Sequence, residues 1–141
     1  MKNLTAILMG VYILFHASLC NAEWVVIVSK TNPTEAMTQA DVEKIFLGKL
    51  KLFPDGSSAI PLDMPDKSAE KITFYEQAVG KTESQLRAYW SRVIFTGSGA
   101  PPKAVASSAD MLKLVAENPN TIGYVDKALI NETVRVVWAT P

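Results

Sequence analysis

The stretch Trp24-Val25-Val26-Ile27-Val28-Ser29 is a short, continuous apolar run that is rich in β-branched residues. It lacks the alternation of polar and apolar residues that marks a strand with one face in water. It therefore predicts a strand that is buried on both faces. We expect helices to cover the sheet that contains it.

Four later segments carry helix signals, namely a Ser, Thr or Asp cap followed by apolar residues at helical spacing. The first runs from about 39 to 47 and ends before Gly48, which suits the left-handed residue after a helix. The others begin near Asp66 or Ser68, at Thr82 with Gln85 as its capping-box partner, and at Ser107. Gly80 ends the second helix, and Asn118-Pro119 ends the fourth.

Residues 121–125 and 133–138 predict two further strands, separated by a short helical turn near residues 127–129. No repeat, linker or low-complexity block divides the chain. The expected architecture is one α/β domain, in which a small mixed sheet is flanked by about four helices.

An irregular hairpin is predicted between the first helix and the second. Its arms, residues 50–53 and 59–62, flank Pro54-Asp55-Gly56, a turn sequence in which Pro fixes φ and Gly accepts a positive φ. Pro61 has no N–H to donate, so it predicts that the second arm lies at an edge of the sheet.

Residues 1–22 have the pattern of an export signal. Lys2 supplies a positive charge, residues 4–15 are almost all apolar, and Cys20-Asn21-Ala22 resembles a cleavage site. Lipid attachment at the cysteine is disfavoured because Leu19 stands where a small side chain is wanted. We expect cleavage after Ala22 and a periplasmic domain of residues 23–141.

The export segment contains the only Cys and the only His, so the remaining 119 residues have neither. Zinc–thiolate sites, thiolate nucleophiles and imidazole catalysis are therefore excluded from the mature domain, and we expect no enzyme, metal or cofactor. Removing Lys2 leaves 13 basic against 14 acidic residues, a net charge near −1. This balance gives no attraction to nucleic acid.

Several motifs occur in a recognisable order. Residues 38–52, TQADVEKIFLGKLKL, contain a short helix that ends in I-F-L-G-K, and Ile122-Gly123-Tyr124-Val125 follows Asn118-Pro119. Between them lie Trp90, a Gly- and Pro-rich loop and a helix. Together these motifs, over most of residues 34–130, resemble the phosphate-binding proteins of ABC importers, the PstS-type class II periplasmic binding proteins. Since that family is two-lobed and about twice as long, the resemblance implies a single lobe of its type II fold.

The resemblance also implies an anion site. The family's phosphate segment, R-x-D-x-S-G-T, falls on residues 64–70 of this chain, where Asp66 and Ser68 match the acidic acceptor and the hydroxyl donor. Lys67 would replace part of the charge of the family's Arg. Backbone N–H groups at the helix start, near Ser68 and Ala69, would add further donors.

Three positions of that segment depart from the family. Met64 stands at the Arg position and offers no charge-assisted hydrogen bond, and Ala69 stands at the Gly position. Glu70 stands at the Thr position and brings a negative charge where a hydroxyl would donate. An alternative interpretation is that Asp66 and Ser68 are only helix caps.

A second candidate anion site is the loop of Thr96, Gly97 and Ser98, whose successive N–H groups could cradle an anion. The alternative for this loop is a flexible connection after a helix.

Three carboxylates, Asp63, Asp66 and Glu70, lie close together in the sequence. They lack the ordered spacing of a calcium loop, so we expect solvated surface acids without a catalytic role.

The sequence supports two functional hypotheses. The first is a non-enzymatic periplasmic protein that recognises phosphate or a similar oxyanion and is linked to ABC-type uptake. The second is an interaction module that has lost its ligand and docks on another cell-envelope protein or on itself. The partners would be a small oxyanion, an ABC permease or other envelope protein, or a second copy of the chain.

Overall fold

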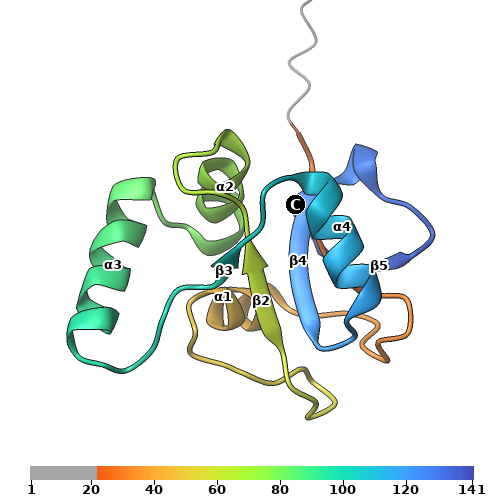
Figure 1. Ribbon diagram of the computed structural model, residues 1–141, viewed down its shortest axis with the longest axis horizontal. Coiled ribbons are helices and arrows are strands. Elements are labelled where there is room, and N and C mark those ends of the chain that lie inside the picture. Colours follow the sequence, from red (N-terminus) through yellow and green to blue (C-terminus); the bar gives the residue numbers. More distant parts are fainter. Residues whose placement is uncertain (1–21) are drawn as a thin grey trace, which may run out of the picture.

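The computed structural model describes residues 22–141, so all of the predicted export segment except Ala22 lies outside the described residues. These residues form a five-stranded sheet in the order β3-β2-β4-β1-β5 (Figure 1). The strands are β1 (Trp24–Ser29), β2 (Ile60–Asp63), β3 (Lys103–Ala104), β4 (Thr121–Asp126) and β5 (Val134–Ala139). Strand β1 is antiparallel to β4 and β5, whereas β2 is parallel to β3 and β4, so the sheet is mixed as predicted.

The helices also follow the prediction. They are α1 (Gln39–Phe46), α2 (Ala69–Phe74), a π-helix η1 (Tyr75–Val79), α3 (Glu83–Phe95), α4 (Ser108–Glu117) and a 3₁₀ turn η2 (Lys127–Leu129). The four α-helices are capped by Thr38, Ser68, Thr82 and Ser107, each of which accepts a hydrogen bond from a backbone N–H of the first turn. Gly48 and Gly80 both have φ of 70°, the left-handed conformation expected after a helix.

Helices cover both faces of the sheet, as the alternation along β4 shows. A Cβ on Gly123 would lie 2.3 Å from Sδ of Met111 in α4, so Gly123 faces α4. The next residue, Tyr124, stacks on Phe74 of α2 with ring centroids 3.7 Å apart. Since successive residues of a strand point to opposite faces, α4 covers one face and α2 the other.

Strand β1 lies at the centre of the core. All six of its residues are buried, as the unbroken apolar run predicts. It has hydrogen-bonded neighbours on both sides, and α4 packs against it, so none of its apolar side chains is more than 5% exposed.

The predicted hairpin is wrong in its second arm. Leu52 and Ser58 form a single antiparallel bridge around the turn, but residues 60–63 form β2 and pair in parallel with β3 and β4. The prediction of an edge strand is therefore also wrong, because β2 lies between two strands. Pro61 is tolerated there because β3 pairs only with Leu62 and Asp63, so β2 has one neighbour at the level of Pro61.

Helix α3 stands to one side of the sheet in Figure 1. Only Leu86 and Trp90 of its thirteen residues are buried, and it approaches α2 at its first turns. Within residues 22–141 no helix combines the length and the apolar character that crossing a membrane requires.

Candidate functional site

A buried carboxylate lies at the end of β2. Asp63 is only 1% exposed and accepts hydrogen bonds from the hydroxyls of Tyr124 and Tyr75, the latter at 2.8 Å. The backbone N–H of Met64 donates a further bond at 2.9 Å. Because a buried carboxylate is costly without partners, these three donors are what allow Asp63 to occupy the core.

The two tyrosines are fixed by aromatic packing. Their rings belong to a cluster with Phe46 and Phe74, in which most pairs meet edge to face. Burial, and next the negative charge of Asp63, raise the pKa of both Tyr75 and Tyr124. Both hydroxyls therefore remain protonated and act as donors.

The expectation that Asp63 is a solvated surface acid is wrong. Its partners Tyr75 and Tyr124 lie 12 and 61 positions further along the chain, and only the folded sheet brings them together. Asp66 does match the expectation, because its side chain is 88% exposed.

Lys71 connects the buried carboxylate to the surface. Its ammonium lies 3.4 Å from Asp63 and 2.6 Å from Asp66, and its side chain is 14% exposed. Burial acts to lower the pKa of Lys71, but the hydrogen bond to Asp66 and the charge of Asp63 outweigh it, and the pKa is raised. The hydrogen bond from Lys71 and its positive charge lower the pKa of Asp66. The pair is therefore ionised at neutral pH.

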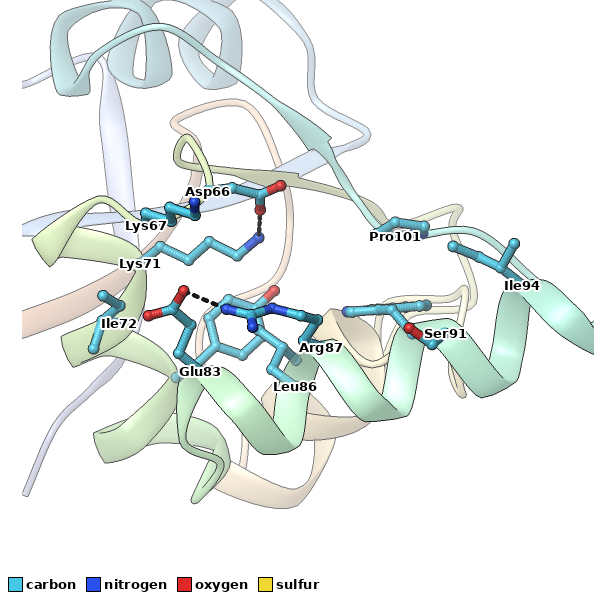
Figure 2. A pocket seen from close by; sticks show the side chains of 12 residues that line it. Asp66, Lys67, Lys71, Ile72, Glu83, Leu86, Arg87, Ser91, Ile94 and Pro101 are labelled. Atoms are coloured by element: carbon cyan, nitrogen blue, oxygen red, sulfur yellow. Dashed lines mark hydrogen bonds and ion pairs between the residues drawn. The ribbon is translucent and has the colours of Figure 1, made fainter.

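A cavity of about 300 Å³ lies between the start of α2, η1 and the inner face of α3 (Figure 2). Three cationic side chains line it, from Lys67, Lys71 and Arg87, together with the carboxylates of Asp66 and Glu83. Arg87 and Glu83 form an ion pair at 2.8 Å on the first turns of α3. The rest of the wall is mainly apolar and consists of Ile72, Tyr75, Leu86, Trp90, Ser91, Ile94 and Pro101.

The structure brings only part of the predicted anion site to this cavity. Asp66 and Lys67 line it, whereas Ser68 and Ala69 do not. The hydroxyl of Ser68 accepts a bond from the N–H of Lys71 at 3.3 Å, and the N–H of Ser68 donates to the carbonyl of Pro65 at 3.1 Å. Ser68 is thus the cap of α2, and its role in anion binding stays a prediction.

The loop of Thr96, Gly97 and Ser98 follows the opposite end of α3, and none of the three residues lines the cavity. Their N–H groups donate to the carbonyls of Arg92, Ile94 and Val93, at 3.0 to 3.1 Å. These bonds complete the last turn of α3. An anion-binding role for the loop stays a prediction, separate from the cavity.

Lys71 and Arg87 were not among the site residues predicted from the sequence. Lys71 lies only four positions after Lys67, but Lys67 precedes the cap Ser68 and has φ of 64°, so helical spacing does not link the two residues. Arg87 lies on another helix, and only the fold places it opposite Lys67. Met64, at the position where the resemblance implies an Arg, is 3% exposed and packs in the core.

The fold of this chain has counterparts among solved structures. It is similar to an ABC-type phosphate transport receptor from Vibrio cholerae, with 16% identity and a TM-score of 0.64 over 82% of this chain and 46% of the receptor. It is also similar to a Clostridium perfringens protein, assigned as a phosphate ABC transporter substrate-binding protein and solved with bound phosphate. That match has 20% identity and a TM-score of 0.65 over 82% of this chain and 45% of the other.

PstS from Borrelia burgdorferi gives a similar match, with 16% identity and a TM-score of 0.60 over 82% of this chain and 47% of PstS. The chain has the fold of one lobe of these PstS-like receptors. The predicted single-lobe α/β fold is thereby confirmed, and the chain spans slightly less than half of the length of the receptors. Neither a protein-family model nor a curated protein sequence matches the chain.

Proposed function

We propose that this chain is a non-enzymatic solute-binding protein that recognises a small oxyanion in the cavity between α2 and α3. The observation that carries the proposal is the convergence of Lys67, Lys71 and Arg87 on one cavity. The PstS-like fold supports it, since similar structures are named as phosphate receptors. The export signal of residues 1–22 supports a periplasmic location, with residues 23–141 as the binding domain.

The three cations would act in different ways. The Arg87 guanidinium offers a planar fork that can donate two parallel bonds to an oxyanion, which is the function missing at Met64. Lys71 is mostly shielded from water, so its attraction for an anion is screened less than that of an exposed lysine. Lys67 adds a third positive charge at the rim.

Two carboxylates compete with an anion for these cations. Asp66 forms an ion pair with Lys71, and Glu83 forms an ion pair with Arg87. A bound anion would replace one or both carboxylates as the partner of these side chains. Asp66 and Glu83 are both partly or largely exposed, so they can rotate into water at little cost.

The test is a calorimetric titration of the purified protein with phosphate, sulfate and molybdate. We expect heat of binding and a rise in Tm at millimolar anion, because a ligand that binds only the folded state stabilises it. Arg87→Gln should weaken binding about tenfold, equivalent to about 1.4 kcal/mol. Arg92→Gln is the matched control, because Arg92 lies on the same helix but does not line the cavity. Absence of both heat and thermal shift would refute the proposal.

An interaction module is the second candidate function, and exposed side chains on α3 favour it. Phe95 is 90% exposed and Ile94 is 57% exposed, at the end of a helix that few contacts hold to the sheet. Large exposed apolar side chains are typical of surfaces that contact another protein. The partner would be an ABC permease, another envelope protein or a second copy of the chain. Light scattering of the wild type and of Phe95→Ser tests self-association, which the substitution should abolish.

A further inference from the structure

The cavity between α2 and α3 changes in polarity from one end to the other. Lys67, Lys71 and Asp66 lie at the α2 end, and Arg87 with Glu83 faces them from the first turns of α3 (Figure 2). At the other end the labelled side chains are Ser91, Ile94 and Pro101. Glu83, Arg87, Ser91 and Ile94 are spaced three or four positions apart, so they follow one another along a single face of α3.

Apolar side chains of α3 contribute to the wall of the cavity. Leu86 and Trp90 are the two buried residues of this helix, whereas Ile94 is 57% exposed. The indole N–H of Trp90 is buried and has no hydrogen-bond partner within residues 22–141. Trp90 and Pro101 also line a second cavity, of about 310 Å³, between α3 and the start of β2. Trp90 and Pro101 therefore lie between the two cavities.

The volume of the cavity is larger than an inorganic oxyanion requires. Phosphate consists of one phosphorus atom and four oxygens, and the cationic end alone would accommodate it. A cavity of about 300 Å³ lies within the range of sites for small organic molecules. An inorganic ion would leave the exposed side chain of Ile94 in contact with water, and this apolar surface would contribute nothing to binding.

We propose that the ligand is an organic anion, composed of one compact acid group and an apolar body. The acid group, a phosphate ester or a carboxylate, binds Lys67, Lys71 and Arg87. The body, an aromatic ring or a short aliphatic chain, lies along Leu86, Trp90 and Ile94. This inference rests on the proposed function, because it assigns the ligand class of the same cationic site. Each buried methylene of the body adds about 0.8 kcal/mol of binding free energy, equivalent to about fourfold in affinity.

The experiment compares matched pairs of ligands by calorimetric titration of the full protein. Phenyl phosphate is compared with inorganic phosphate, and benzoate with acetate, so that each pair shares the acid group while only one member has a ring. We expect the ring to increase affinity at least tenfold in one pair or both. Whichever of phenyl phosphate and benzoate binds more tightly then identifies the acid group. Equal affinities within both pairs would overturn the inference, although the proposed function would stand. If no anion binds at all, the proposed function itself fails.

Two neighbouring substitutions locate the apolar body. Ile94→Ser should weaken the tighter aromatic ligand about fivefold and leave its ring-free counterpart unchanged, since Ile94 lines only the apolar end. Phe95→Ser is the control, because Phe95 is equally apolar and more exposed but does not line the cavity. Both positions are exposed, so neither variant should lose the fold. Equal effects of the two substitutions, or no effect of Ile94→Ser, would overturn the placement of the body.

Discussion

Asp63 is a buried charged residue that contacts both the aromatic core and the cavity-lining Lys71. It holds the hydroxyls of Tyr75 and Tyr124 on one side and Lys71 on the other, and so joins the aromatic core to the cationic cavity. Replacing it by Asn would keep the shape but remove the charge, and an amide N–H donor would stand in place of one of the two oxygens that accept from the tyrosine hydroxyls. We expect Asp63→Asn to destabilise the protein by about 3 kcal/mol, measured by urea unfolding.

Asp66→Asn is the matched control for that substitution. Asp66 also pairs with Lys71, but its side chain is 88% exposed, so its replacement should cost less than about 1 kcal/mol. Similar losses for the two variants would show that burial of Asp63 is not what makes it important.

The Asp66–Lys71 pair gives stability a dependence on pH. The pKa of Asp66 is lower in the folded protein than its ordinary 3.8, so the pair adds stability above pH 3.8. This contribution disappears as the pH falls through the lower, folded value. The difference in unfolding free energy between wild type and Asp66→Asn should therefore be present at neutral pH and decrease as the pH falls below 3.8. A difference that stays constant over this range would contradict the assignment.

At the scale of elements, the close contact between β4 and α4 depends on Gly123, which has no side chain. A Cβ on Gly123 would lie 2.3 Å from Sδ of Met111 and 3.2 Å from Cγ2 of Val115. Both neighbours are fully buried, so neither can move aside freely. We expect Gly123→Ala to destabilise the protein by about 2 kcal/mol in thermal or urea unfolding.

Gly99→Ala is the control for this prediction, because its Cβ would meet only Val93, at an ordinary 3.4 Å. Its effect should remain within about 0.5 kcal/mol. A pair of variants, Gly123→Ala alone and combined with Met111→Ala, would show whether the clash is the cause. Partial recovery in the combined variant supports it, and simple additivity of the two losses contradicts it.

Elements that depend on local chemistry were predicted correctly from the sequence. The caps Thr38, Ser68, Thr82 and Ser107 each act within three residues, so the sequence contains all the information needed to place them. The pairing of residues 60–63 was predicted wrongly because its partners are distant: β4 lies about 60 residues further along. The two-residue β3 was not predicted, since so short a segment carries no periodicity.

The residues of the candidate site also fall into those that a local motif predicts and those that only the fold brings together. Asp66, Lys67 and Ser68 could be named from a local motif, and two of them line the cavity. Arg87 and the buried Asp63 could not be placed, because their surroundings exist only after α3 and β4 have packed. The departures at Met64, Ala69 and Glu70 indicated that the family's ligand geometry had changed, but not which side chains would replace it.

At the scale of the whole molecule, the sheet and α3 differ in how far their residues are buried. The sheet is covered on both faces, whereas α3 buries only Leu86 and Trp90. Backbone amides of α3 should therefore exchange with deuterium faster than those of β1 and β4, because a helix with few buried contacts opens locally. A saturating ligand of the cavity should slow exchange in α3. Equal protection of α3 and β4 in the free protein would contradict this prediction.

The position of β1 in the sheet has a consequence for how the polypeptide matures. The N–H of Trp24 donates to the side chain of Thr140, 116 positions away, and both neighbours of β1 come from the last quarter of the described residues. During synthesis, the apolar β1 segment is made early, whereas the strands that pair with it are made late. Its backbone N–H and C=O groups therefore have no strand partners until nearly the entire chain is available. The five-stranded sheet can therefore close only when the last strands have been made, and folding of this lobe should be a late event in its synthesis.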